Sequence, residues 1–589
     1  MNVKTKLWII LFVLILFSVS AYGQTYEPNW QSLKRIQTPR WLQDGKFGIY
    51  THWGPYAVHA YGSNTTWYSF ALYMDPEGEA RQHFEKKFGK LTAEFGYKDL
   101  IPKFTAHKFN ADEWADLFQK AGAKFAGPVA EHHDGFAMWD TKYSEWNAAK
   151  MGPKRDIVGE LEKAVKKRGM KYVTAFHHAA NWFFFPVHDK RYDTGDPKNH
   201  GLYGQYHLPG EKRNQAFIDE WYGKIIEVID NYSPDFIWFD FALDELPEGY
   251  IKDFLAYYYN HADKANKEVV VTYKGHDIIP GAGVRDLELG QEPNITYNDW
   301  ITDSSVDDRG AWGYAEDLIF KTPNRLVDNL IDRVSKNGYL LLNVGPKPDG
   351  TIPEGAKEVL LEMGAWLKVN GEAIYSTTPW FVAAEGPTNL GEASAIGFNE
   401  SNVVYTPEDI RFTVSGDNLY AIFLDWPGEM ALISTINASG PEAEKVKIPE
   451  WVQFEEFKSI VGTEWDVSVD GEKYHLIFKE NGKLWISGGR AGAKVVGGHG
   501  QDGETIYIDS EIFAEVGFYD GETFTFGESE QPNYPGFYKE EIKRITLLGD
   551  DKDLEWVMTE RGLAIKTPEK KGKYAYVFKI ERYHHPRIK

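Results

Sequence analysis

The stretch Pro234-Asp235-Phe236-Ile237-Trp238-Phe239-Asp240 decides the fold class of this chain. It follows an amphipathic segment and a Ser-Pro turn, and its β-forming residues predict a short buried strand that ends in one carboxylate. A carboxylate at the exit of a strand buried on both faces is costly unless it opens into a cleft. In a parallel α/β barrel the C-terminal strand ends face such a cleft, so Asp240 is a candidate catalytic residue. The alternative is that Asp240 only caps a helix beginning near Pro247.

Other strand-like runs end in the same way. The side chains that follow them are His52, His132 with His133, His177 with His178, and Lys274. Helical patterns alternate with these runs, which predicts βαβ units around a parallel sheet. We find no Gly-rich phosphate loop between a strand and a helix, as an open doubly wound sheet would usually carry. The sequence therefore predicts an α/β fold with a (β/α)8, TIM-like barrel over residues 24–375.

The pattern changes after about residue 376. Short strands and turns replace the alternation, beginning with a hairpin over 410–425 and ending with a strand over 574–580. We expect an all-β C-terminal module over 376–589, most simply a β-sandwich. The β-rich and Gly-rich stretch at about 440–537 is predicted to be an insertion into it.

Composition narrows the possible partners. The 589 residues carry a formal net charge of −22, which argues against nucleic acid and other polyphosphates as ligands. Aromatic residues make up 15% of the chain, and aromatic faces stack on sugar rings. The aromatic content is therefore a mild indication that the protein binds carbohydrate.

The N-terminus has the pattern of an export signal. Lys4 and Lys6 precede an apolar run, and Ala21-Tyr22-Gly23 supplies a small-x-small cleavage pattern. We expect a secretory signal peptide over 1–23, and a periplasmic or extracellular protein. The chain has no cysteine, so it has no disulfides, and no later stretch is apolar enough to span a membrane.

Two carboxylates at a barrel mouth are the minimum for glycoside hydrolysis. Asp240 is the first, and Asp286, Glu288 and Glu292 are candidates for the second. These three lie in what reads as a long irregular connection, which could place a mobile acid over the cleft.

Histidines at several strand ends raise the possibility of a metal site. Adjacent histidines on a regular strand point to opposite faces, so His132 and His133 could not share one metal ion. The chain also lacks HExxH. We therefore expect no metal and no cofactor, and assign these histidines to sugar hydroxyls.

Five collinear motifs resemble the α-L-fucosidases of glycoside hydrolase family 29, over roughly residues 28–380. They are Lys46-Phe47-Gly48-Ile49-Tyr50-Thr51-His52-Trp53-Gly54, His132-His133-Asp134-Gly135-Phe136-Ala137-Met138-Trp139, Trp238-Phe239-Asp240, Trp312-Gly313-Tyr314 and Leu341-Leu342-Asn343-Val344-Gly345-Pro346.

The resemblance implies a retaining exo-glycosidase that releases terminal α-L-fucose without a cofactor. It implies that Asp240 is the nucleophile and that Glu288 is the acid/base, with Glu292 as second choice. The side chains expected to bind substrate are His52, Trp67, His132, His133, His178, Trp238, Lys274 and Trp312.

Three positions depart from the family pattern. Thr66 stands where a glutamate is frequent, Lys274 where an arginine is frequent, and residues 177–182 replace a region usually built on Tyr or Ser. They lie in the predicted sugar pocket, so α-L-galactosides and sulfated α-L-fucosides are alternative substrates. A non-catalytic carbohydrate-binding protein is the alternative from another class.

Overall fold

The structure is a computed structural model of the whole chain. It describes residues 26–388, 400, 402–437, 447–454, 458–469, 471–480, 482–489, 493–502, 505–510, 514–519, 524–526 and 539–584. The predicted signal peptide at 1–23 lies outside the described residues.

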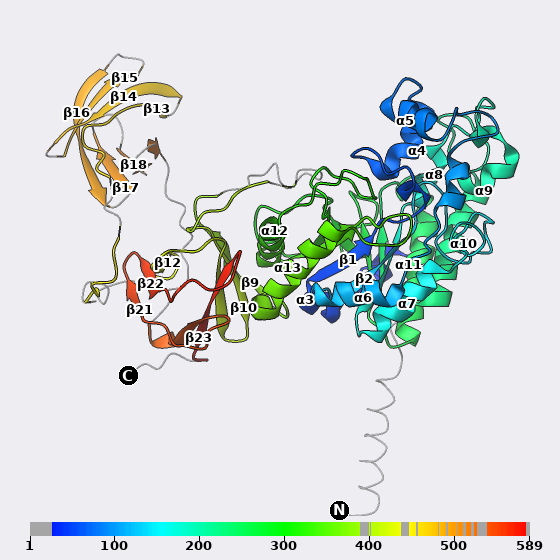
Figure 1. The fold of residues 1–589 in the computed structure, drawn as a ribbon. Coiled ribbons are helices and arrows are strands. Elements are labelled where there is room, and N and C mark those ends of the chain that lie inside the picture. Colours follow the sequence, from blue (N-terminus) through cyan, green and yellow to red (C-terminus); the bar gives the residue numbers. More distant parts are fainter. Residues whose placement is uncertain are drawn as a thin grey trace, which may run out of the picture. The chain divides into compact units, whose positions relative to one another are not determined.

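A closed parallel barrel of eight strands forms the first part of the chain (Figure 1). The barrel closes by pairing its last strand with its first, for example Thr51 with Val344. This confirms the predicted (β/α)8 fold and excludes the open sheet. The strands are β1 (Phe47–Thr51), β2 (Phe125–Glu131), β3 (Lys171–Phe176), β4 (Phe236–Phe239), β5 (Val270–Tyr273), β6 (Val284–Asp286), β7 (Trp300–Ser305) and β8 (Gly338–Val344).

Helices separate most of the strands, and local signals set their ends. Asn110 caps α6 by accepting the backbone N–H groups of Asp112 and Glu113. Asn337, at φ 71°, ends the last turn before β8. The helices of this part are α2 (Trp30–Leu33), α3 (Arg40–Gly45), α4 (Tyr68–Met74), α5 (Glu79–Lys87), α6 (Ala111–Lys120), α7 (Ile157–Lys167), α8 (Asn181–Phe184), α9 (His200–Tyr203), α10 (Gln215–Tyr232), α11 (Glu248–Lys264), α12 (Pro323–Ser335) and α13 (Glu354–Asn370).

The barrel interior is a packed core. Side chains from alternate strand positions, including Tyr50, Phe125, Trp238, Ile301 and Leu341, fill it. Polar side chains such as Asp286, Asp303 and Asn343 occur toward the C-terminal strand ends, so titratable groups gather at that mouth of the barrel.

Two strands lie where irregular chain was expected. Residues 283–292 contain β6, and β7 follows it and pairs with it at Asp286 and Ile301. The backbone N–H groups of Leu287 and Leu289 continue the ladder by donating to Ile301 and Asp303. The expectation of a mobile connection carrying the second acid is therefore wrong.

A five-stranded antiparallel sheet belongs to the same compact unit as the barrel, which comprises the described residues of 26–428, 540–554 and 568–584. Arg411 on β10 forms a buried ion pair with Asp332 on α12, 2.6 Å apart, and so joins sheet and barrel. The sheet order is β20-β23-β11-β10-β9, with β9 (Thr378–Glu385), β10 (Ile410–Ser415), β11 (Asn418–Phe423), β20 (Ile542–Leu547) and β23 (Tyr576–Arg582).

The second compact unit comprises the described residues of 429–539 and 555–567. Its three-stranded sheet has the order β12-β22-β21, with β12 (Met430–Ile433), β21 (Trp556–Thr559) and β22 (Gly562–Lys566). Its seven-stranded meander consists of β13 (Glu464–Val469), β14 (Glu472–Phe478), β15 (Lys483–Gly488), β16 (Ala493–Asp502), β17 (Thr505–Asp509), β18 (Ala514–Tyr519) and β19 (Phe524–Phe526). The antiparallel C-terminal sheets fit the predicted β-module, and the domain boundaries at 375 and at 440–537 stay predictions.

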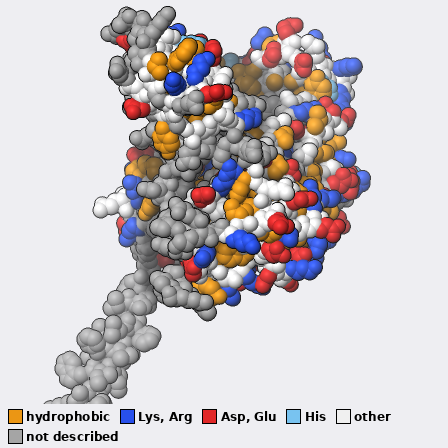
Figure 2. Space-filling view, turned by 90° about the vertical axis from the view of Figure 1, so that its left-hand side faces the viewer, with side chains coloured by type: hydrophobic (Ala, Val, Ile, Leu, Met, Phe, Trp, Pro, Cys, Tyr) orange, Lys and Arg blue, Asp and Glu red, His pale blue; other side chains and the backbone are white. Residues whose placement is uncertain are grey.

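On the face drawn in Figure 2, acidic and basic side chains of the described residues are interspersed. No helix in the described part of the chain combines the length and the apolar character needed to cross a membrane.

Candidate active site

The C-terminal ends of the barrel strands bring titratable side chains to one place. Asp240 directly follows β4 and is 8% exposed. His177 follows β3 on one side of it, and Lys274 follows β5 on the other. The predicted strand-end cluster is therefore present, and Asp240 does not cap α11, whose N-cap is Pro247.

Two imidazoles contact the Asp240 carboxylate. His177 Nδ1 donates a hydrogen bond of 3.0 Å to Oδ2. His133 Nε2 lies 3.2 Å from the same oxygen, in a close contact that is less well directed. Burial raises the pKa of this carboxyl, but the contacts with His133 and His177 outweigh burial and hold the pKa well below its usual range. Asp240 is therefore an ionised carboxylate at neutral pH.

Lys274 lies at the centre of four carboxylates. Its Nζ atom contacts Glu288 Oε2 and lies 3.2 Å from Asp303 Oδ1, 3.5 Å from Asp286 Oδ2 and 3.9 Å from Asp240 Oδ1. Burial lowers the pKa of the ammonium, but the surrounding carboxylates reverse this and raise it well above its usual range. One positive charge thus faces four acidic groups, which favours a proton on at least one of them.

The proton resides best on Asp286, the last residue of β6, and on Glu288, just after it. Burial and the charge of Asp303 raise the pKa of Asp286 well above its usual range. Burial raises the pKa of Glu288 to about 8, against the opposing effect of Lys274. Asp240 and Glu288 thus form a pair of one ionised and one protonated carboxyl, the arrangement that acid–base chemistry on a glycosidic bond requires.

Neighbouring side chains hold the acidic cluster in place. Trp238 Nε1 donates to Asp286 Oδ2 at 2.8 Å, and Tyr50 Oη donates to Asp303 Oδ2 at 2.8 Å. The Lys274 Nζ atom also lies 4.7 Å from the centre of the Trp238 ring. These contacts fix the acids as part of the barrel wall.

Asn343 on β8 orients His52. The Asn343 amide nitrogen donates to Trp312 O at 2.7 Å, so its Oδ1 atom is the acceptor. This oxygen accepts the backbone N–H and the Nδ1–H of His52, each at 2.9 Å. The Nε2 atom of His52 therefore carries the free lone pair.

The imidazole nitrogens His132 Nδ1 and His177 Nε2, at this mouth, have no hydrogen-bond partner among the described residues. Burial lowers the pKa values of His52 and His132 well below the usual range and that of His177 to about 4. Imidazole nitrogens without a partner at a barrel mouth are suited to the hydroxyl groups of a ligand.

Aromatic rings form the walls of the site. Trp67 lies 5.1 Å from His133 and 5.3 Å from Phe184, measured between ring centres, and it stacks on Phe241. The Trp312 ring lies 5.3 Å from His52. Trp67 and Trp312 thus lie beside the histidines, and their role in binding substrate stays a prediction.

The structure places two predicted residues away from Asp240. His178 packs against Phe176 and Trp221, and its Nε2 atom lies 3.5 Å from Trp221 O. The backbone leaves the strand conformation at His177, which turns His177 rather than His178 into the site. Glu292 lines a different hollow, beside the first residues of β5 and β7. We therefore correct His178 to His177 and drop Glu292 as an acid/base candidate.

The premise that His132 and His133 lie in a regular strand does not hold, although no candidate metal group among the described residues contains both. Strand β2 ends at Glu131, so His132 and His133 are not in a regular strand and both enter the same site, with ring centres 4.4 Å apart. Two groups could hold a metal ion by the proximity of their ligand atoms: His52, His132 and His177, and separately His133, His177 and Asp240.

Sequence reasoning missed Asn343, Asp303 and Tyr50, and it placed His178 rather than His177 among the substrate-binding residues. The signal for Asn343 was a single amide inside the apolar run of β8, and for Asp303 a carboxylate between two hydroxyl residues. A lone polar residue in a strand that is otherwise buried on both faces is costly and therefore informative.

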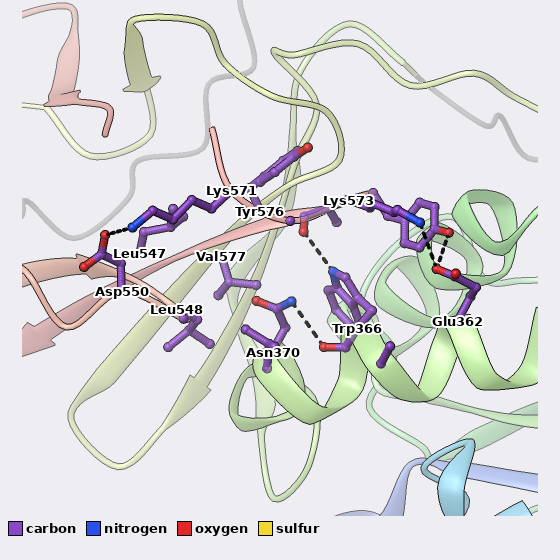
Figure 3. A pocket seen from close by; sticks show the side chains of 16 residues that line it. Glu362, Trp366, Asn370, Leu547, Leu548, Asp550, Lys571, Lys573, Tyr576 and Val577 are labelled. Carbon is purple, nitrogen blue, oxygen red and sulfur yellow. Dashed lines mark hydrogen bonds and ion pairs between the residues drawn. The ribbon is translucent and has the colours of Figure 1, made fainter. Parts of the chain in front are cut away.

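A separate cavity of about 480 Å³ lies between α13 and the C-terminal strands of the same unit (Figure 3). Its floor is mainly apolar, and the charged groups at its edge are paired, Asp550 with Lys571 and Glu362 with Lys573. These ion pairs occupy the charged groups of the cavity. We therefore assign the acid–base chemistry to the barrel mouth.

A (β/α)8 barrel whose mouth combines an ionised and a protonated carboxyl with imidazoles and aromatic side chains has the features of a barrel glycosidase. A family model named alpha-L-fucosidase matches residues 14–372. The tissue alpha-L-fucosidase of Rattus norvegicus is 33% identical over 455 residues, which cover 75% of this chain and 88% of that protein. The human tissue enzyme is 32% identical over 425 residues, covering 70% and 82%.

Solved structures agree. The crystal structure of Thermotoga maritima alpha-fucosidase superimposes with a TM-score of 0.60 at 25% identity, over 94% of this chain and all of that chain. This chain belongs to the α-L-fucosidase family, glycoside hydrolase family 29. It is a glycosidase of the fucose-releasing class, and its substrate is a fucosylated carbohydrate.

Proposed function

We propose that this protein removes terminal α-L-fucose with retention of configuration, through a covalent glycosyl-enzyme on Asp240. The observation that carries the proposal is the sharing of the Lys274 ammonium by Asp240 and Glu288. A single Nζ atom within ion-pair distance of both carboxyl groups favours the separation of about 5–5.5 Å of retaining enzymes over the about 6.5–9.5 Å of inverting ones.

In the first step Asp240 attacks C1 of the sugar and forms an ester, while the bond from C1 to the leaving oxygen breaks. Glu288 gives its proton to that oxygen. In the second step the Glu288 carboxylate takes a proton from water, the water oxygen attacks C1, and the ester bond to Asp240 breaks. Each carboxyl returns to its starting state, so no cofactor is needed.

The histidines would bind the sugar hydroxyls, and Trp67 with Phe184 and Phe241 would provide an apolar wall for the methyl group of fucose. Such a wall rejects the extra hydroxyl of an L-galactoside by only about 100-fold. The charge of Lys274 is already matched by carboxylates, so it offers little to a sulfate ester. We therefore favour unsubstituted α-L-fucosides over α-L-galactosides and sulfated fucosides.

We also propose export. The pattern Ala21-Tyr22-Gly23 predicts cleavage before Gln24, and the mature enzyme would act in the periplasm or outside the cell. N-terminal sequencing of protein secreted by its native host tests this, and a mature chain that retains residues 1–23 contradicts it.

The decisive experiment measures nitrophenol release from 4-nitrophenyl α-L-fucoside by wild type and by Asp240→Gly, with and without azide. We expect the variant to lose at least about 10⁴-fold in kcat/KM. Azide should restore release and yield a fucosyl azide of inverted configuration. A variant that keeps wild-type activity rules out Asp240 as the nucleophile.

A panel of aryl glycosides tests the sugar. The expected order of kcat/KM is α-L-fucoside, then α-L-galactoside, then sulfated α-L-fucoside. Activity confined to either of the last two would replace the proposed substrate and leave the mechanism intact. Binding of L-fucose without turnover of any of the three would identify a carbohydrate-binding protein.

A further inference from the structure

Three histidines at the barrel mouth have the arrangement of a transition-metal site. His52, His132 and His177 are buried, and each offers a ring nitrogen within 4.8 Å of the nitrogens of the other two. They come from the ends of three consecutive strands, β1, β2 and β3, so the barrel itself holds them together.

Two of the three rings are already oriented as metal ligands. His177 donates its Nδ1–H to Asp240 Oδ2, and His52 donates its Nδ1–H to Asn343 Oδ1. Both Nε2 atoms therefore present lone pairs, and His177 Nε2 has no partner among the described residues. Metal-binding histidines typically use their second nitrogen in this way, to a carboxylate or another fixed acceptor.

The third ring supplies an unused nitrogen. His132 Nδ1 is buried and has no partner within the described part of the chain. The ring centre of His132 lies 4.2 Å from that of His177 and 5.5 Å from that of His52. Tetrahedral Zn²⁺ with bonds of about 2.0–2.1 Å needs nitrogens about 3.3 Å apart, so a side-chain movement of about 1 Å or slightly more completes the site.

We propose that His52, His132 and His177 bind a divalent transition metal ion of the Zn²⁺ type in the absence of sugar, and that this ion competes with substrate. Three imidazoles leave a fourth coordination position, which a water molecule can fill. The ion occupies the nitrogens that a sugar would otherwise use, so metal and sugar exclude each other. Competition rests on the proposed function, whereas metal binding does not.

The direct test titrates the purified wild-type protein with Co²⁺ alone. Visible d–d absorption bands of a tetrahedral Co²⁺ ion with nitrogen ligands are expected, and Zn²⁺ should displace the Co²⁺ and abolish them. Zn²⁺ should also raise the unfolding temperature, because it binds the native state only. A spectrum of six oxygen ligands, or no spectral change, overturns the proposal.

Variants locate the ion. His132→Gln and His52→Gln should each weaken metal binding at least about tenfold. The control is His475→Gln, because His475 is a surface histidine beside Asp466 and Glu464, where a metal would bind adventitiously. Binding that persists in both cleft variants, or disappears in the His475 control, contradicts the site. If either His132→Gln or His52→Gln does not fold, the remaining variant and the spectrum of the wild type still test the proposal.

Kinetics test the competition. Zn²⁺ should raise the KM of wild type for the aryl fucoside without changing kcat, and a chelator should reverse the effect. L-Fucose should displace Co²⁺ and bleach its bands. Inhibition that lowers kcat at constant KM contradicts the cleft as the site. A protein that binds Co²⁺ at the histidines but hydrolyses no glycoside would refute the proposed function and leave the metal site standing.

Discussion

The two halves of the barrel mouth satisfy their polar groups in opposite ways. Strands β1 to β3 end in imidazoles, of which several nitrogens have no partner among the described residues. Strands β5 to β7 bring acidic groups that all contact Lys274. Asp240, which directly follows β4, lies between the halves and contacts both, through His177 and Lys274.

This difference separates two tasks that a glycosidase must perform. Unused polar atoms gain hydrogen bonds only when a ligand arrives, so the histidine half is suited to binding. Mutually paired acids around one ammonium keep protons that isolated carboxyls would lose, so the acidic half is suited to proton transfer. Substitutions in the two halves should therefore have different kinetic signatures.

The largest effect in the acidic half is expected from Glu288→Gln. Loss of the general acid should lower kcat/KM about 10²–10⁴-fold for fucosides with poor leaving groups, and much less for those of acidic phenols. In wild type kcat/KM should fall as the pH rises through about 8, because the acid must be protonated and burial raises its pKa to that value. Two results would show that another group donates the proton. One is an equal loss of kcat/KM for all leaving groups, and the other is an unchanged basic limb in the pH profile of the variant.

Lys274→Met should come next. The variant leaves buried carboxylates without a countercharge, which should destabilise the fold by about 3–5 kcal/mol and lower kcat/KM about 100-fold. Urea unfolding and initial rates measure the two effects, and Lys274→Arg serves as the charge-preserving control. A variant of normal stability and activity would show that the shared ammonium does not organise the acids.

His177→Gln should have a smaller effect on rate and a distinct effect on pH dependence. The imidazole helps hold the pKa of Asp240 below its usual range, so its loss should raise that pKa. Activity, which needs ionised Asp240, should then disappear at a higher pH as the solution is acidified. We expect a loss of about tenfold in kcat/KM at neutral pH. An unmoved acid limb in the pH profile would contradict the role of the imidazole.

The smallest effect should come from Glu292→Gln. Its side chain lines a hollow near the first residues of β5 and β7, so kcat/KM and its pH profile should stay within about twofold of wild type. A loss as large as that of Glu288→Gln would require the segment after β6 to rearrange during catalysis.

Much of this arrangement follows from local sequence patterns. The strand ends at His52, Asp240 and Lys274 were predicted, because an apolar run that stops at a polar residue is a local signal. The barrel follows from the alternation of these elements.

The features that could not be predicted depend on the exact residue at which a strand begins or ends. Whether His177 or His178 faces the site depends on where β3 ends, and the two side chains diverge because the backbone turns there. Strand β6 has only three residues, with Arg285 exposed in the middle, too short for a periodic pattern. Strand β7 was not predicted because Asp303 and Ser304 interrupt its apolar pattern. Hydrogen bonds from Tyr50 and Lys321, which are distant in sequence, offset the cost of burying these polar side chains.

The most direct test of the mechanism is to trap its intermediate. The enzyme should be incubated with a 2-deoxy-2-fluoro-L-fucosyl fluoride, whose fluorine slows hydrolysis of the glycosyl-enzyme, and then digested for peptide mass spectrometry. We predict one fluorofucosyl ester, on the side chain of Asp240, and none in Asp240→Gly. An ester on a different residue, or no ester together with release of sugar of inverted configuration, would contradict the retaining mechanism on Asp240.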